Sequence, residues 1–121
     1  MQPVRLESWR DECGVAAVYG HPEAANLVYL ALYALQHRGQ ESAGIVSADA
    51  GRLIRHVGMG LVADIFSPEV LAKLPGKHAI GHVRYGTAGG SVIENAQPLL
   101  MSHRKGGVAL AHNGNLVNAN Q

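Results

Sequence analysis

The only cysteine in the sequence, Cys13, stands directly before an apolar run at residues 14–19. If the chain began at Cys13, one residue would supply both a nucleophile and a base. A free α-amine has a pKa of about 7.7–8.0 and can accept the thiol proton. The alternative is a buried structural thiol at the start of a strand. Position alone does not decide between these two interpretations.

A second candidate is the pair Asn113 and Gly114, which follows an apolar strand predicted at residues 108–111. An asparagine amide beside a glycine backbone N–H offers two donors to an oxyanion, and glycine leaves room for a reacting carbonyl. An Asn-Gly pair is also a common turn. Taken alone, the turn is the better interpretation.

Two arginines follow predicted elements. Arg84 ends the apolar strand predicted at residues 78–83, and Arg38 follows a predicted helix within residues 36–41 (QHRGQE). A guanidinium so placed can bind a carboxylate through two parallel hydrogen bonds. A surface ion pair for Arg84, or a cation that complements the helix dipole for Arg38, is the ordinary alternative.

The seven histidines do not predict a metal site. His78 and His82 could share one face of a strand, but no third ligand stands at a recognisable spacing. The glycine-rich run at residues 86–90 lacks the lysine of a phosphate-binding loop. One cysteine excludes an intrachain disulfide and a four-cysteine cluster built from this chain alone.

Composition describes one globular domain. The chain has 121 residues, of which 47% are hydrophobic and 16% charged, with a net charge of +1. This charge gives no bias toward nucleic acid or a membrane surface. The first twelve residues lack the apolar core of a secretory signal, and no apolar stretch is long enough to span a membrane. The expected location is the cytoplasm.

These residues need elements to position them. Periodicity and turn signals predict strands at 13–19, 43–48, 53–57, 78–83 and 108–111, and short helices at 61–66 and 68–74. They also predict a long helix that opens at residues 21–23, carries an apolar face over 24–35 and stops at Gly39. Pro22 is expected in the first turn of the long helix, and Gly39 after its end. Residues 86–98 are expected to form a loop. The sum is an α+β domain whose sheet is covered by one long helix.

Taken together and in order, the motifs change the interpretation. They are residues 12–15 (ECGV), 35–45 (LQHRGQESAGI), 81–90 (GHVRYGTAGG), 95–99 (NAQPL) and 111–116 (AHNGNL). This set strongly resembles the glutaminase domain of the glutamine phosphoribosylpyrophosphate amidotransferase family, over essentially all of residues 12–120. The resemblance implies an N-terminal-nucleophile (Ntn) hydrolase fold, a four-layer αββα sandwich that is incomplete in this chain.

The resemblance also assigns roles. Cys13 matches the catalytic cysteine that follows a propeptide, here residues 1–12. Asn113 and Gly114 match the oxyanion pair, and Arg84 matches the arginine that binds the α-carboxylate of glutamine. Further residues that border the site are Arg38, Tyr85 and Thr87.

For the whole enzyme, the family implies transfer of ammonia from glutamine to phosphoribosyl pyrophosphate, the first committed step of purine biosynthesis. The phosphoribosyltransferase domain is expected to be absent from residues 13–121, and with it magnesium and a possible [4Fe-4S] cluster. The full-length enzyme is expected to be a homo-oligomer. The aspartate that binds the glutamine α-amine is also absent. We therefore expect the isolated chain to be inactive or nearly so.

Two other functions fit parts of the pattern. Glucosamine-6-phosphate synthase shares the Arg-Gly-x-x-Ser-Ala-Gly and His-Asn-Gly patterns, but it starts at a cysteine directly after the initiator methionine and has Arg-Trp-Ala-Thr-His where this chain has residues 84–88 (RYGTA). A non-catalytic module with the same fold is the second alternative. Retention of Cys13, Arg84 and the Asn113–Gly114 pair favours the enzyme.

Overall fold

The computed structural model describes residues 14–36, 40–85, 93 and 96–112. In chain order their elements are β1 (Gly14–Tyr19), α1 (Ala24–Leu35), β2 (Gln40–Asp49), β3 (Arg52–Met59), α2 (Val62–Ile65), α3 (Pro68–Ala72), β4 (His78–Tyr85), β5 (Leu99–His103) and β6 (Gly106–Leu110). The strands form two antiparallel sheets, one ordered β1-β4-β2-β3 and the other β5-β6.

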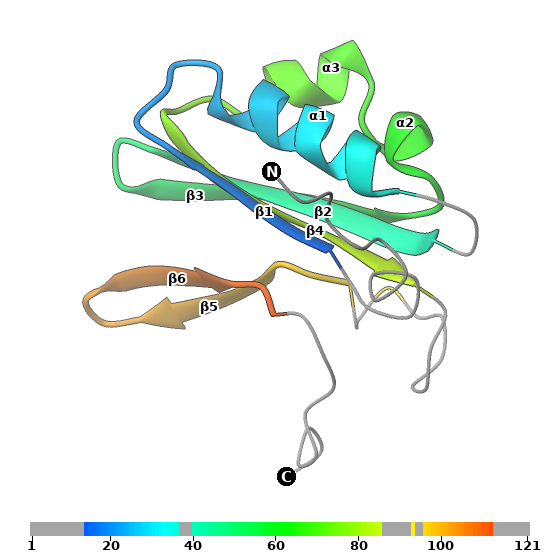
Figure 1. Cartoon of the computed structure of the whole chain (residues 1–121). Coiled ribbons are helices and arrows are strands. Elements are labelled where there is room, and N and C mark those ends of the chain that lie inside the picture. The colour runs from blue at the N-terminus through cyan, green and yellow to red at the C-terminus, as the bar shows by residue number, and fades with distance from the viewer. Residues whose placement is uncertain (1–13, 37–39, 86–92, 94–95, 113–121) are drawn as a thin grey trace, which may run out of the picture.

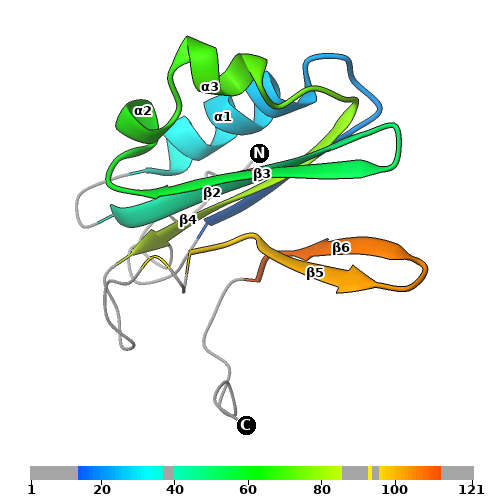
Figure 2. The same ribbon diagram turned by 180° about the vertical axis from the view of Figure 1, so that it is seen from behind.

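The described elements lie in layers. The three helices cover one face of the four-stranded sheet, and the β5–β6 hairpin lies against the opposite face (Figures 1 and 2). The predicted α+β class is confirmed. Among the described residues, no helix is long and apolar enough to cross a membrane.

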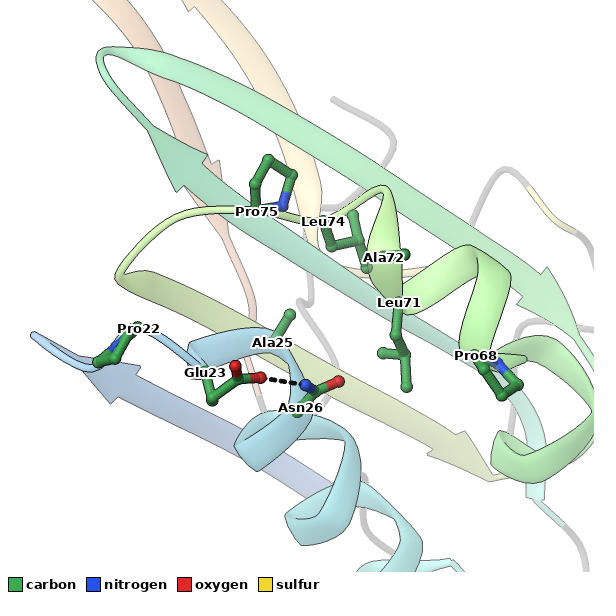
Figure 3. Close-up of a pocket in the computed structure, with 9 residues that line it drawn as sticks. All are labelled: Pro22, Glu23, Ala25, Asn26, Pro68, Leu71, Ala72, Leu74 and Pro75. Atoms are coloured by element: carbon green, nitrogen blue, oxygen red, sulfur yellow. Dashed lines mark hydrogen bonds between the residues drawn. The ribbon is translucent and has the colours of Figure 1, made fainter.

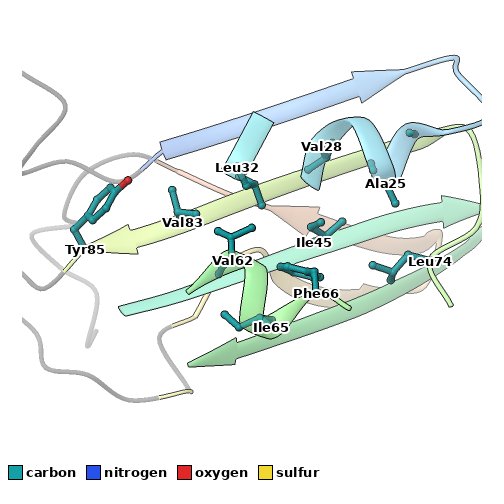
Figure 4. Close-up of a cluster of buried hydrophobic side chains, with 13 residues drawn as sticks. Ala25, Val28, Leu32, Ile45, Val62, Ile65, Phe66, Leu74, Val83 and Tyr85 are labelled. Atoms are coloured by element: carbon teal, nitrogen blue, oxygen red, sulfur yellow. The ribbon is translucent and has the colours of Figure 1, made fainter. Parts of the chain in front are cut away.

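The main core lies between the helices and the four-stranded sheet (Figure 4). Four large core side chains are nearly inaccessible to solvent: Val28 and Leu32 of α1, Val83 of β4, and Phe66, which follows α2. Helix α1 lies so close to β4 that a β-carbon at Gly81 would come within 2.4 Å of Val28 Cγ1. A glycine at this position therefore sets the separation between helix and sheet.

The predicted long helix is confirmed over its apolar face at 24–35, but its predicted start at Pro22 is wrong. Helix α1 begins at Ala24, so Pro22 precedes the first turn. The backbone N–H of Ala24 donates to the carbonyl of His21, which makes residues 21–24 a turn that leads into the helix. The helix ends at Leu35, whereas Gly39 lies outside the described residues.

The turn after β2, the start of α3 and the strand β5 complete the comparison with the sequence. The turn between β2 and β3 has positive φ at Ala50 and Gly51, as a two-residue hairpin turn requires. The Ser67 hydroxyl accepts the Val70 N–H at 3.2 Å and so caps the start of α3, the helix predicted at 68–74. Strand β5 was not predicted: Leu99 is half-buried, residues 100–102 are exposed, and the strand forms through pairing with β6.

Candidate functional site

Arg84 and Tyr85 end strand β4 and point to opposite faces of the sheet. Arg84 is half-buried and pairs in register with buried Ser42 of β2, on the face away from the helices. Tyr85 belongs to the core, with 4% of its surface exposed, and its hydroxyl donates to the carbonyl of Leu35. Tyr85 therefore ties the end of β4 to the end of α1, and a contact of its side chain with substrate stays a prediction.

Five other predicted site residues lie outside the described residues: Cys13, Arg38, Thr87, Asn113 and Gly114. Their described neighbours in the chain still locate where the site would form. Cys13 is bonded to Gly14, the first residue of β1, and Asn113 is bonded to His112. The positions of Gly14 and His112 in the fold are therefore the relevant observations.

Strand β4 brings these two neighbours together. Gly14 pairs with Val83, directly beside Arg84. His82 precedes Val83 in β4, and its ring Nε2 lies 3.0 Å from the carbonyl oxygen of His112. Consecutive residues of one strand thus hold the chain segments that lead to Cys13 and Asn113, and the next residue is the predicted carboxylate-binding arginine.

The segment that contains Arg38 is also anchored at both ends. Gln36 and Gln40 both direct a side-chain oxygen at the backbone N–H of Val62, at 3.0 and 3.2 Å. Gln40 also pairs with Tyr85 at the end of β4. The ends of this segment are therefore held by the same part of the sheet that carries Arg84.

His112 is held through its backbone. Its N–H donates to the side-chain oxygen Oε1 of Gln97 at 2.7 Å, and its carbonyl contacts His82. Sequence reasoning missed Gln97 and His82 as site residues. Both stand inside quoted motifs, residues 95–99 and 81–90, but nothing in the sequence indicates that they meet at His112.

Burial dominates the electrostatics of His82. The side chain is inaccessible to solvent, and this desolvation lowers its pKa from the ordinary 6.5 to about 4. The hydrogen bond to His112 acts in the opposite direction, and the charges of His112 and Arg84 lower the pKa further. His82 is consequently neutral at physiological pH.

The segment that carries Gln97 is itself fixed to the four-stranded sheet. Arg55 of β3 donates from Nε to the carbonyl of Pro98 at 2.8 Å and from a terminal nitrogen to the carbonyl of Ala96 at 3.1 Å. Gln97 is 6% exposed. The contacts therefore run from Arg55 through residues 96–98 to the backbone of His112.

A pocket of about 430 Å³ lies elsewhere, between the start of α1 and helix α3 (Figure 3). It is lined mainly by prolines, alanines and leucines, and its polar residues, Glu23 and Asn26, are hydrogen-bonded to each other. None of the predicted site residues lines this pocket. It lies in the helix layer, away from Arg84, and we do not assign it to the site.

Comparison with known proteins places the chain. No protein-family model matches it. It is 54% identical over 113 residues to amidophosphoribosyltransferase 1, chloroplastic, of Arabidopsis thaliana, and 54% identical over 117 residues to amidophosphoribosyltransferase of Bacillus subtilis. These matches cover 93% and 96% of this chain. By sequence, this chain is a homologue of the amidophosphoribosyltransferases.

The chain spans only 20% of the Arabidopsis enzyme and 25% of the Bacillus enzyme. A Lacticaseibacillus casei amidophosphoribosyltransferase is 53% identical over 118 residues, and there the match covers 97% of this chain and 61% of the relative. These relatives favour the amidophosphoribosyltransferases over glucosamine-6-phosphate synthase and over a non-catalytic module.

Solved structures agree with this relationship. The glutamine phosphoribosylpyrophosphate amidotransferase of B. subtilis, complexed with ADP and GMP, superposes with a TM-score of 0.71 at 44% identity over 83% of this chain and 21% of that one. A structure described as the allosteric regulatory enzyme of purine biosynthesis also gives 0.71, at 48% identity over 81% of this chain and 21% of its own. The predicted fold, an incomplete Ntn-type α+β sandwich, is confirmed.

Proposed function

We propose that this chain is the glutamine-hydrolysing part of an amidophosphoribosyltransferase, with Cys13 as its nucleophile. One observation carries the proposal. On β4, Val83 pairs with Gly14, His82 contacts the His112 carbonyl, and Arg84 follows. A nucleophile, an oxyanion site and a carboxylate site would thus be built around three consecutive residues.

The reaction follows from these roles. The Cys13 thiolate attacks the side-chain amide carbon of glutamine, while Arg84 binds the α-carboxylate. Asn113 and Gly114 donate hydrogen bonds to the oxygen that becomes negatively charged. Collapse of the intermediate breaks the C–N bond, and the leaving nitrogen departs as ammonia with the proton that the Cys13 α-amine took from the thiol. Water then hydrolyses the γ-glutamyl thioester to glutamate and frees the thiol.

The base in this scheme is the α-amine of Cys13 itself. This requires removal of residues 1–12, since an amine in a peptide bond cannot accept a proton. Arg38 and Thr87 are proposed to border the bound glutamine in supporting roles, and Tyr85 to hold the end of β4 from the core. No metal is assigned to this half of the reaction.

In the complete protein, we propose that ammonia displaces pyrophosphate from phosphoribosyl pyrophosphate to give phosphoribosylamine. The B. subtilis structure is named for the same substrate pair. The phosphoribosyltransferase domain, magnesium, an iron–sulfur cluster and a homo-oligomer remain predictions about that complete protein. A cytoplasmic location is a prediction too, because the Arabidopsis relative is described as chloroplastic.

The test is Cys13→Ala in the protein expressed from its complete gene. Glutamine-dependent synthesis should be abolished, whereas synthesis supplied with free ammonia should continue. Loss of both activities would instead indicate a structural thiol. The intact mass and N-terminal residue of the unmodified protein form the second measurement: a chain that begins at Cys13 supports the amine as base, and an uncleaved chain contradicts it.

A further inference from the structure

The backbone of His112 is bound at both of its polar groups by side chains from different parts of the chain. Gln97 accepts the N–H, and His82 contacts the carbonyl. That carbonyl belongs to the peptide group that joins His112 to Asn113. Because a peptide group is planar, holding its oxygen fixes the direction in which the chain continues.

The His82 ring donates in this contact. A carbonyl oxygen can only accept, so Nε2 carries the hydrogen. The ring is neutral at physiological pH because burial lowers its pKa to about 4, and a neutral imidazole has one N–H. Nδ1 is therefore a bare acceptor, and it has no hydrogen-bond partner among the described residues.

Water cannot easily replace either partner. His82 is fully buried and Gln97 is 6% exposed. The Gln97 backbone also packs closely against Gly44. A β-carbon at position 44 would lie only 2.2 Å from the Gln97 carbonyl oxygen. Both side chains that contact the His112 backbone are thus largely shielded from solvent, which suits the positioning of a hydrogen-bond donor in a reaction.

We propose that His82 and Gln97 are positioning residues for glutamine hydrolysis, which fix the peptide that leads into the oxyanion pair Asn113 and Gly114. This inference rests on the proposed function. Neither residue touches the substrate in this scheme. They act through the His112 backbone, and their loss should affect stabilisation of the oxyanion more than binding of glutamine.

The experiment compares His82→Phe with His82→Gln in the protein from the complete gene. Phenylalanine keeps a planar ring but has no donor, whereas glutamine can present an N–H near the position of Nε2. We expect His82→Phe to lower kcat for glutamine about 10-fold to 100-fold, with KM changed less than about threefold. His82→Gln should recover much of kcat. Gln97→Met, which removes the acceptor at similar size, should resemble His82→Phe.

A tetrahedral analogue separates positioning from general damage. Glutamate γ-semialdehyde adds the cysteine thiol and places an oxygen where the oxyanion would form, whereas the product glutamate does not. His82→Phe should weaken inhibition by the aldehyde at least about 10-fold and leave glutamate binding unchanged. Val28→Ala, in the core on the other face of the sheet, is the stability control and should change neither.

Each outcome decides the matter. Unchanged kcat and aldehyde affinity in His82→Phe would overturn the inference, and so would equal losses in His82→Gln. If His82→Phe also loses ammonia-dependent synthesis, it has failed to fold, and Gln97→Met then decides by the same criteria. Cys13→Ala distinguishes the two proposals: retained glutamine-dependent synthesis there overturns the proposed function itself.

Discussion

The carbonyl oxygen of Gln97 occupies the space above Gly44, so that a β-carbon at position 44 would lie only 2.2 Å from it. Gly81 is confined in the same way on the opposite face of the sheet, where a β-carbon would meet Val28 at 2.4 Å. These two glycines therefore set the spacing of two different layers. Gly44 determines how closely residues 96–98 approach the sheet, and Gly81 does so for helix α1.

This pair yields a matched prediction. Gly44→Ala and Gly81→Ala should each lower the free energy of unfolding by about 1–3 kcal/mol, since an added methyl group overpacks both interfaces. Only Gly44→Ala should also lower kcat for glutamine, because it displaces Gln97 from His112. Urea unfolding and steady-state kinetics are the measurements. Equal kinetic losses in the two variants would contradict the assignment of Gln97.

Arg55 should influence the site from a distance. Its two hydrogen bonds to the carbonyls of Pro98 and Ala96 hold the segment that carries Gln97. Arg55→Met should lower stability by about 1 kcal/mol and reduce glutamine-dependent turnover severalfold, with ammonia-dependent synthesis unaffected. Arg52→Met, an exposed arginine on the same strand, is the matched control. Equal turnover in the two variants would contradict a role for Arg55 in holding the site.

Arg84 should govern the affinity for glutamine. Lysine keeps the positive charge but cannot form two parallel hydrogen bonds with a carboxylate. Arg84→Lys should therefore raise KM for glutamine at least about 10-fold and leave ammonia-dependent synthesis intact. Arg104→Lys, in the exposed turn between β5 and β6, should change neither quantity. An unchanged KM in Arg84→Lys would assign Arg84 to a structural ion pair.

Stability should depend on pH through His82. Its pKa is about 4 in the folded protein and 6.5 when unperturbed, so the unfolded chain binds the proton first as pH falls. The stabilisation from a neutral His82 is complete above pH 6.5 and is lost progressively between pH 6.5 and 4, by about 3 kcal/mol in total.

Urea unfolding of the purified protein at pH 4–8 measures this dependence. His82→Gln should remove that part of the slope, whereas His21→Gln, at an exposed histidine, should retain it. An equally steep slope in both variants would show that other groups cause the loss of stability at low pH.

Much of this protein was determined by local sequence. The helix at 24–35 follows from its apolar spacing, the β2–β3 hairpin from its turn, and the start of α3 from the Ser67 cap. Each depends on residues a few positions apart, so short-range hydrogen bonding and periodicity suffice. The ordered set of motifs likewise carried the family relationship, because motif order is itself a property of the sequence.

Only the tertiary structure decided how the site is held together. The contacts of His112 with His82 and Gln97 join residues 30 and 15 positions apart, and those of Arg55 reach across more than 40. Tyr85, expected beside the substrate, has its ring in the core. These contacts arise because β4 lies between β1 and β2, with the β5–β6 hairpin folded against the opposite face. Strand order and sheet packing depend on how segments far apart in the sequence bury one another. A local sequence pattern does not contain this information.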